Sequence, residues 1–94
     1  MKQHQYEIQV KHLSDAKGQP STYPQALVFE VGNHDDIFKI VERIKSRGDL
    51  QGYEEALAVG PKLFSQVMLE NKDHPLFSEF KPHFMDFIKQ LKKG

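Results

Sequence analysis

The chain has 94 residues, a length that suits one domain over residues 1–94, and its 13 basic and 13 acidic residues cancel. Hydrophobic residues make up 38% of the sequence, which is too many for a disordered chain. A chain with no net charge lacks the broad positive field of proteins that bind nucleic acid nonspecifically. The absence of cysteine excludes disulfides, thiolate nucleophiles and cysteine-ligated metal sites.

Two segments near the start alternate between apolar and polar residues, the pattern of strands with one face on a core. The first covers about residues 5–13 and the second about 26–31, and Gly32 is expected to end the second strand. Residues 14–25, between them, are rich in Gly, Pro, Ser and Asp and indicate an exposed connection. We therefore predict an antiparallel ribbon whose apolar face is covered by helices, because a two-stranded ribbon is only marginally stable alone.

A helix is predicted over about residues 34–47, and its apolar residues recur with helical spacing. They are Ile37, Ile40, Val41 and Ile44. Asn33 is the expected N-cap, accepting a hydrogen bond from the amide of Asp36, whose carboxylate reaches back to the Asn33 amide. Gly48 follows Arg47 as a stop signal, because glycine adopts the left-handed conformation that ends many helices.

Further helices are predicted over about residues 52–71 and 82–92, with a short helical turn at about 75–80. Pro61 lacks an amide hydrogen and its ring crowds the Leu57 carbonyl, so we expect a kink or a division there rather than an uninterrupted helix. The expected buried residues of the helix at 52–71 are Leu57, Pro61, Phe64, Val67 and Met68, and those of the helix at 82–92 are Phe84, Phe87, Ile88 and Leu91. Together these elements predict an α+β fold, a two-stranded antiparallel ribbon packed against three or four helices in the order β-β-α-α-α.

The chain resembles a family of small bacterial proteins known only as a domain of unknown function. The resemblance runs along nearly the whole chain and is carried by FEVGNHDDIFKIVERI at residues 29–44, LAVGPKLFSQVMLENKDHPLF at 57–77 and the ending PHFMDFIKQLKKG. The resemblance implies a small α+β domain of bacterial cytoplasmic origin, and it implies no catalytic residue. Pro61 departs from the usual residue of the family at that position.

The sharpest local cluster is Asn33-His34-Asp35-Asp36, whose side chains are of types that bind divalent metals or transfer protons. Helix capping already explains the aspartates, and the spacing matches no common metal motif, so we predict no metal, no cofactor and no catalytic residue. His74 and His83 flank the last connection and could approach His34 only through the fold. The metal candidates are therefore His34, Asp35, Asp36 and His74.

The sequence predicts no phosphate site, no nucleic-acid interface and no membrane-spanning segment. No glycine-rich phosphate motif is present, and the aspartates at the first helix start repel anions. The aromatic residues of the last helix belong to its buried stripe, so no stacking platform for nucleic acid is expected. No stretch is apolar for long enough to cross a membrane, and the polar first residues lack a signal-peptide apolar region, so a cytoplasmic location is expected.

We therefore predict a non-catalytic module that binds another protein or forms a small homodimer. Its expected contact surfaces are the open strand edges or exposed faces of the last two helices. The alternative is a small-molecule-binding protein or enzyme with a pocket between ribbon and helices. The polar lining of such a pocket would be Tyr6, Tyr23, Tyr53, His34 and His74.

Overall fold

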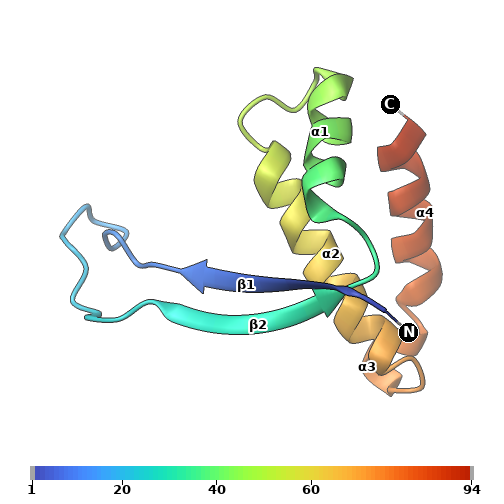
Figure 1. The fold of residues 1–94 in the computed structure, drawn as a ribbon, viewed down its shortest axis with the longest axis horizontal. Coiled ribbons are helices and arrows are strands. Elements are labelled where there is room, and N and C mark those ends of the chain that lie inside the picture. Colours follow the sequence, from blue (N-terminus) through green and yellow to red (C-terminus); the bar gives the residue numbers. More distant parts are fainter. Residues whose placement is uncertain (1, 94) are drawn as a thin grey trace.

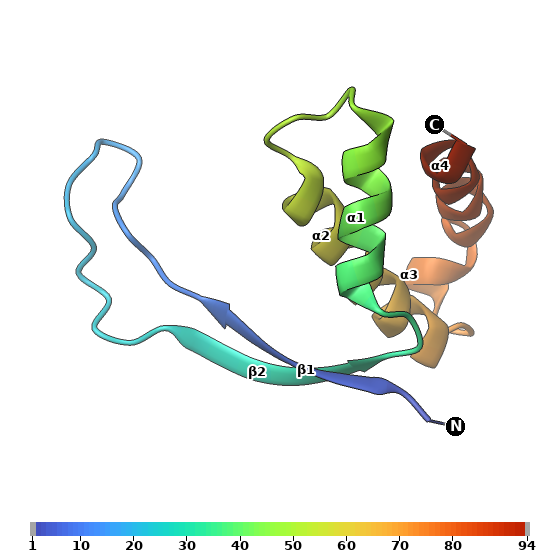
Figure 2. The ribbon, with the colours of Figure 1, turned by 45° about the horizontal axis from the view of Figure 1, so that its top comes forward.

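The computed structural model describes residues 2–93 and has an α+β fold in which a two-stranded ribbon precedes four helices (Figure 1). The ribbon projects away from the helices, which lie together at one end of the molecule (Figure 2). In chain order the elements are β1 (His4–Val10), β2 (Leu27–Asn33), α1 (Ile37–Arg47), α2 (Glu54–Glu70), α3 (Pro75–Ser78) and α4 (Lys81–Lys93). The predicted fold class and element order are confirmed.

The two strands pair antiparallel over their full lengths, from His4 opposite Asn33 to Val10 opposite Leu27. Gly32 does not end the second strand, because its backbone pairs with Gln5 and the ladder continues for one more residue. The first strand ends at Val10 rather than Leu13. The register places six apolar side chains on one face of the ribbon, which we call the apolar face: Tyr6, Ile8, Val10, Leu27, Phe29 and Val31.

Residues 11–26 form a loop at the far end of the ribbon, which we call the tip loop. Within it the Asp15 carboxylate accepts hydrogen bonds from the amides of Lys17 and Gln19, each at 2.9 Å, and Ser14 bridges to Pro20. These short-range bonds are typical of Asx turns. The ribbon and the tip loop together are called the arm.

Helix α1 begins at Ile37, three residues later than predicted, and ends before Gly48, whose φ of 80° is left-handed. Helix α2 is not divided at Pro61 but continues across it. The residue before Pro61 is Gly60, which has no Cβ to clash with the proline ring.

Helix α4 begins at Lys81, one residue before Pro82, and packs against the rest through Phe84. The Phe84 ring lies 5.4 Å from the ring of Phe64 on α2 and 6.1 Å from that of Phe80, centre to centre. A hydrogen bond of 2.7 Å from Arg47 Nη1 to the carbonyl oxygen of Leu91 ties the end of α4 to the end of α1. The structure thus anchors α4 at both ends.

The core among the described residues is small and lies between the helices. Its buried apolar residues are Ile37, Ile44, Ala58, Met68 and Phe84. Phe64, Val67 and Phe87, which we expected to be buried, are exposed. On α2 the residues turned inward are Ala58, Gln66 and Met68, and on α4 the buried residue is Phe84. No helix among residues 2–93 is both long and apolar enough to span a bilayer.

Candidate functional site

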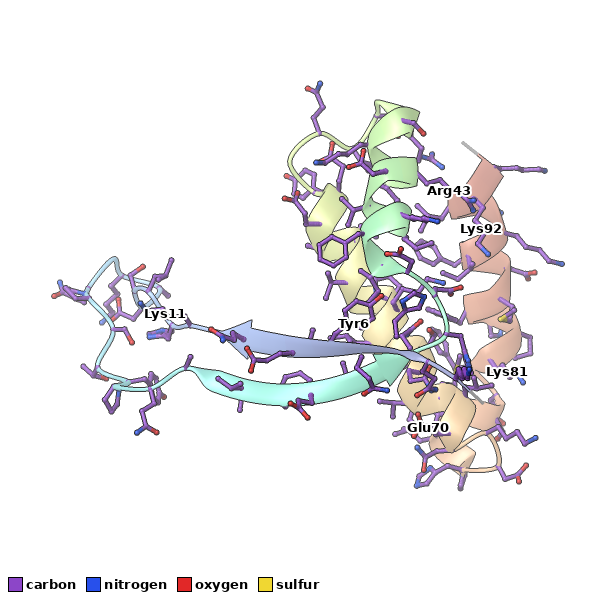
Figure 3. All side chains as sticks on the ribbon, in the orientation of Figure 1. Tyr6, Lys11, Arg43, Glu70, Lys81 and Lys92 are labelled. Atoms are coloured by element: carbon purple, nitrogen blue, oxygen red, sulfur yellow. The ribbon has the colours of Figure 1, made fainter. Side chains whose placement is uncertain are left out.

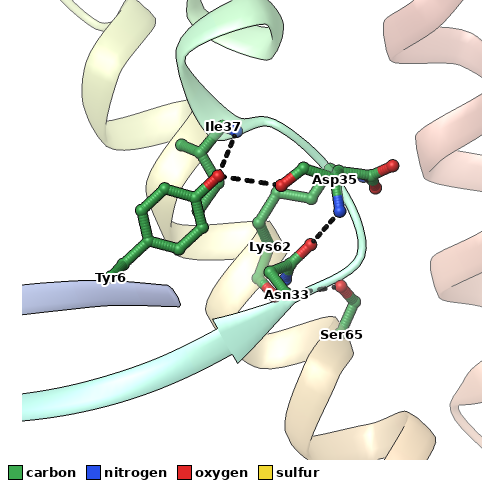
Figure 4. A network of polar contacts seen from close by, with 6 residues as sticks. All are labelled: Tyr6, Asn33, Asp35, Ile37, Lys62 and Ser65. Atoms are coloured by element: carbon green, nitrogen blue, oxygen red, sulfur yellow. Dashed lines mark hydrogen bonds and ion pairs between the residues drawn. The ribbon is translucent and has the colours of Figure 1, made fainter. Parts of the chain in front are cut away.

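The base of the arm is joined to α1 by the side chain of Tyr6 (Figure 4). Its hydroxyl donates a hydrogen bond to the carbonyl oxygen of Asp35 and accepts one from the amide of Ile37, both at 2.9 Å. The Ile37 amide is one of the donors at the start of the helix that have no acceptor within α1, so the Tyr6 hydroxyl supplies the missing acceptor. The phenol therefore fixes the arm to the helices.

Asn33 is not the N-cap of α1, contrary to our prediction. Its side chain is 3% exposed and is used in two other bonds. The Oδ1 atom accepts from the amide of Asp35 at 2.9 Å, and Nδ2 donates to the carbonyl oxygen of Lys62 at 3.0 Å. Asn33 thus shapes the turn between β2 and α1 and attaches that turn to α2.

Asp36 is the N-cap instead. Its Oδ1 atom accepts hydrogen bonds from the amides of Phe38 at 3.1 Å and Lys39 at 3.4 Å. These are the second and third amides of α1, the usual partners of a capping carboxylate. Asp36 was therefore correctly identified as a capping residue, but its carboxylate serves the helix that follows and does not reach back to Asn33.

Asp35 forms an ion pair with Lys62 on α2, with 2.7 Å between the carboxylate and Nζ. The hydrogen bond from Lys62 holds the pKa of Asp35 below its ordinary value of 3.8, and the positive charges of Lys62, Lys92 and His34 act in the same direction. His34 is exposed beside it. The pair links the β2–α1 turn to α2 a second time.

The residues that we considered as metal ligands have separate structural positions. His74 caps the short helix α3, where its Nδ1 atom accepts from the amide of Leu76 at 3.1 Å. Asp35 and Asp36 are engaged by Lys62 and by α1, as described above. Among residues 2–93 the structure brings together no group of three histidine or acidic side chains with metal-binding geometry.

The five residues expected to line a pocket are not gathered at one place. Tyr6 lines a groove of about 530 Å³ between the ribbon, α1 and the first turns of α2, whereas His34 lines a cavity of about 230 Å³ between α2 and α4. Tyr23 in the tip loop and Tyr53 before α2 are both exposed. His74 lies at α3.

The feature that the sequence did not predict is the uncovered part of the apolar face. Val10, Leu27 and Phe29 are 55%, 63% and 40% exposed, because they lie on the half of the ribbon beyond the helices. We call these three residues the outer patch. The alternation of apolar residues predicted the face, but the length by which the ribbon exceeds the helices is visible only in the structure (Figure 2).

Comparison with known proteins gives a family and a fold but no activity. Residues 4–93 match the profile of a family described as a domain of unknown function with a solved structure, DUF3861. A crystal structure of a protein of unknown function from Pectobacterium atrosepticum is similar at 34% identity, with a TM-score of 0.82 over 99% of this chain and 100% of that one. No curated protein matches the sequence. The chain belongs to the DUF3861 family, whose function is unknown.

Proposed function

We propose that this protein is a non-catalytic interaction module that forms a homodimer through the apolar face of its arm. The observation that carries the proposal is the outer patch. Val10, Leu27 and Phe29 form a continuous apolar surface on a ribbon that the helices of the same chain do not reach. Contiguous apolar surface of this kind marks interaction sites in proteins.

The total exposed surface supports an obligate partner. The chain exposes 7670 Å², whereas a compact monomer of 10.9 kDa exposes about 5,600 Å². Its radius of gyration is 15.7 Å, against about 12 Å for a compact domain of this length. The excess of about 2,000 Å² is in the range that one subunit buries in a large homodimer interface.

The occupant is a second copy because the molecule offers both halves of a self-complementary contact. The arm is a projecting ridge, and the groove beside it, which we call the arm groove, is a recess. Tyr6 and Ile8 form one wall of the arm groove, and Phe38, Val41 and Val59 contribute the apolar part of the other. In a two-fold dimer each outer patch enters the partner's arm groove, so both recesses are filled at once.

This arrangement moves the expected contact surface from the strand edges to the ribbon face. Edge pairing would leave Leu27 and Phe29 exposed, because side chains point out of the plane of the strands. Face packing covers them, together with the exposed ring of Phe38 on α1. The apolar area therefore favours packing through the face.

The test is the mass in solution, measured by light scattering after gel filtration and by sedimentation. The wild-type chain is expected at twice 10.9 kDa. Leu27→Lys places a charge on the outer patch and should give the monomer. Gln9→Lys, which adds the same charge to the opposite face of the ribbon, should leave the dimer intact.

A wild-type protein that stays monomeric at high micromolar concentration would overturn the proposal. Equal loss of the dimer in Leu27→Lys and Gln9→Lys would overturn the assignment of the face. Circular dichroism of both variants checks that the helices, which the arm does not enclose, remain folded (Figure 1).

A further inference from the structure

A second recess, which we call the helix groove, lies between α2 and α4 and is closed at one end by the β2–α1 turn. It holds about 230 Å³ and is distinct from the arm groove. Its apolar lining comes from one stripe of each helix: Pro61, Met68, Leu69, Phe84, Met85 and Ile88. Phe84 is part of the core, so the floor of the groove is rigid, while Met85 on its wall is exposed.

The charges around the helix groove are unbalanced. Lysine ammonium groups line it from α2 and α4, contributed by Lys62, Lys81 and Lys92, and Asp35 is the carboxylate among its lining residues. Lys81 and Lys92 lie at opposite ends of α4 (Figure 3). Asp35 is already paired with Lys62 at 2.7 Å, which leaves the ammonium group of Lys92 as the positive charge at the closed end.

Apolar walls and an excess of positive charge suit a ligand that has an apolar part and a negative charge. We propose that the helix groove binds a small organic anion with a short apolar tail. The anionic head lies at the closed end near Lys92, and the tail runs along Ile88, Met85 and Leu69. A purely apolar ligand would gain nothing from the ammonium groups, and an inorganic anion would gain nothing from the apolar walls.

The arm of a second copy is a poor occupant of the helix groove. Its tip loop carries Lys11 and Lys17 against the carboxylate of Asp15, so its net charge is positive and its approach would bring like charges together. The outer patch, moreover, is already assigned to the arm groove. The ligand site therefore does not depend on the homodimer, and the two proposals fail separately.

The probe is octanoate, titrated into ¹⁵N-labelled protein and followed by amide chemical shifts. We expect saturable binding at one site per chain, with the largest shifts in residues 33–35, 61–69 and 84–92. Affinity should rise from acetate through butanoate to octanoate, because the apolar walls bind the tail. 1-Octanol, which has the tail without the charge, should bind more weakly.

Two matched variants test the charge. Lys92→Gln should weaken octanoate binding about fivefold and leave 1-octanol unchanged, as expected for the loss of one charge contact. Lys93→Gln removes the same charge from the neighbouring residue, which does not line the helix groove, and should have little effect on either ligand.

The proposal is overturned if octanoate causes no saturable shifts at millimolar concentration or if its shifts centre on the arm. It is also overturned if octanol binds as tightly as octanoate, or if both lysine variants weaken octanoate binding equally. The mass measured in the presence of octanoate reports separately on the dimer.

Discussion

The hydroxyl of Tyr6 and the amide of Ile37 are joined by a hydrogen bond of 2.9 Å, which fixes the base of the arm to the first residue of α1. A second bond from the same hydroxyl reaches the carbonyl oxygen of Asp35. Together with the contacts of Asn33 and Asp35 to Lys62, the phenol group holds the ribbon in its orientation to the helices.

Tyr6→Phe should lower the free energy of unfolding by about 1–3 kcal/mol, because the partly buried Ile37 amide loses its acceptor while the ring remains. Urea denaturation measures the change. Tyr23→Phe is the matched control, since Tyr23 lies exposed in the tip loop and its change should stay within about 0.5 kcal/mol. Equal effects of the two substitutions would show that the Tyr6 hydroxyl does not hold the arm.

The ion pair of Asp35 and Lys62 should make stability depend on acid pH. The pKa of Asp35 is lowered in the folded chain, chiefly by the hydrogen bond from Lys62, so its contribution is complete above the ordinary value of 3.8. It is lost as the pH falls through the lower folded-state pKa. Because the carboxylate is half exposed, the contribution is about 0.2–1 kcal/mol.

Urea midpoints of the wild type and Asp35→Asn, measured from pH 7 to pH 2, test this dependence. The difference between them should be constant above pH 5 and should vanish at the acid end. In a Lys62→Gln background the difference should be small at every pH. A constant difference across the whole range would mean that the pair contributes nothing through charge.

Phe84→Ala should lower the free energy of unfolding by about 3–5 kcal/mol. The ring is 7% exposed and packs against Phe64 and Phe80, so its loss opens a cavity between α2 and α4. Phe87→Ala, on the same helix at 46% exposure, should cost clearly less. Denaturant unfolding of both variants makes the comparison, and a larger effect at Phe87 would contradict the observed packing.

Arg47→Lys should loosen the end of α4. The guanidinium forms bonds of 2.9 Å from Nε and Nη2 to the Asp49 carboxylate while Nη1 reaches the Leu91 carbonyl, and a lysine ammonium cannot reproduce this fork. We expect faster amide hydrogen exchange in residues 88–93. Arg43→Lys, one turn earlier on α1, should leave that exchange unchanged, and equal exchange in both variants would mean that packing alone holds α4.

The local patterns of the sequence predicted the elements and their order, but several boundaries depended on distant partners. Gly32 resembles the end of a strand when only its neighbours are considered, but its backbone pairs with Gln5. Asn33 resembles a cap, but its Oδ1 accepts from the nearby amide of Asp35 while its Nδ2 donates to the carbonyl of Lys62. The pairing of Gly32 and the contact with Lys62 depend on residues distant in the sequence. Sequence reasoning that uses only neighbouring residues therefore cannot see them.

The candidate surfaces were harder to predict than the fold. The period-two pattern identified the apolar face of the ribbon but not which half the helices leave uncovered. On α2 the apolar residues are too evenly spread for periodicity to choose a stripe, and the structure buries Gln66 while Phe64 stays partly exposed. Arg47 was identified only as part of a helix stop, because its bond to Leu91 crosses from α1 to α4.

The geometry of the arm also determines how the protein tolerates changes of length. One residue inserted inside β1 would turn every later side chain of that strand onto the opposite face, so Val10 would leave the surface shared with Leu27. Residues added to the tip loop would cost little loop-closure entropy and would leave both faces as they are. The tip loop can therefore change in length without altering either face, whereas an odd number of residues inserted between His4 and Val10 would exchange the two faces of β1.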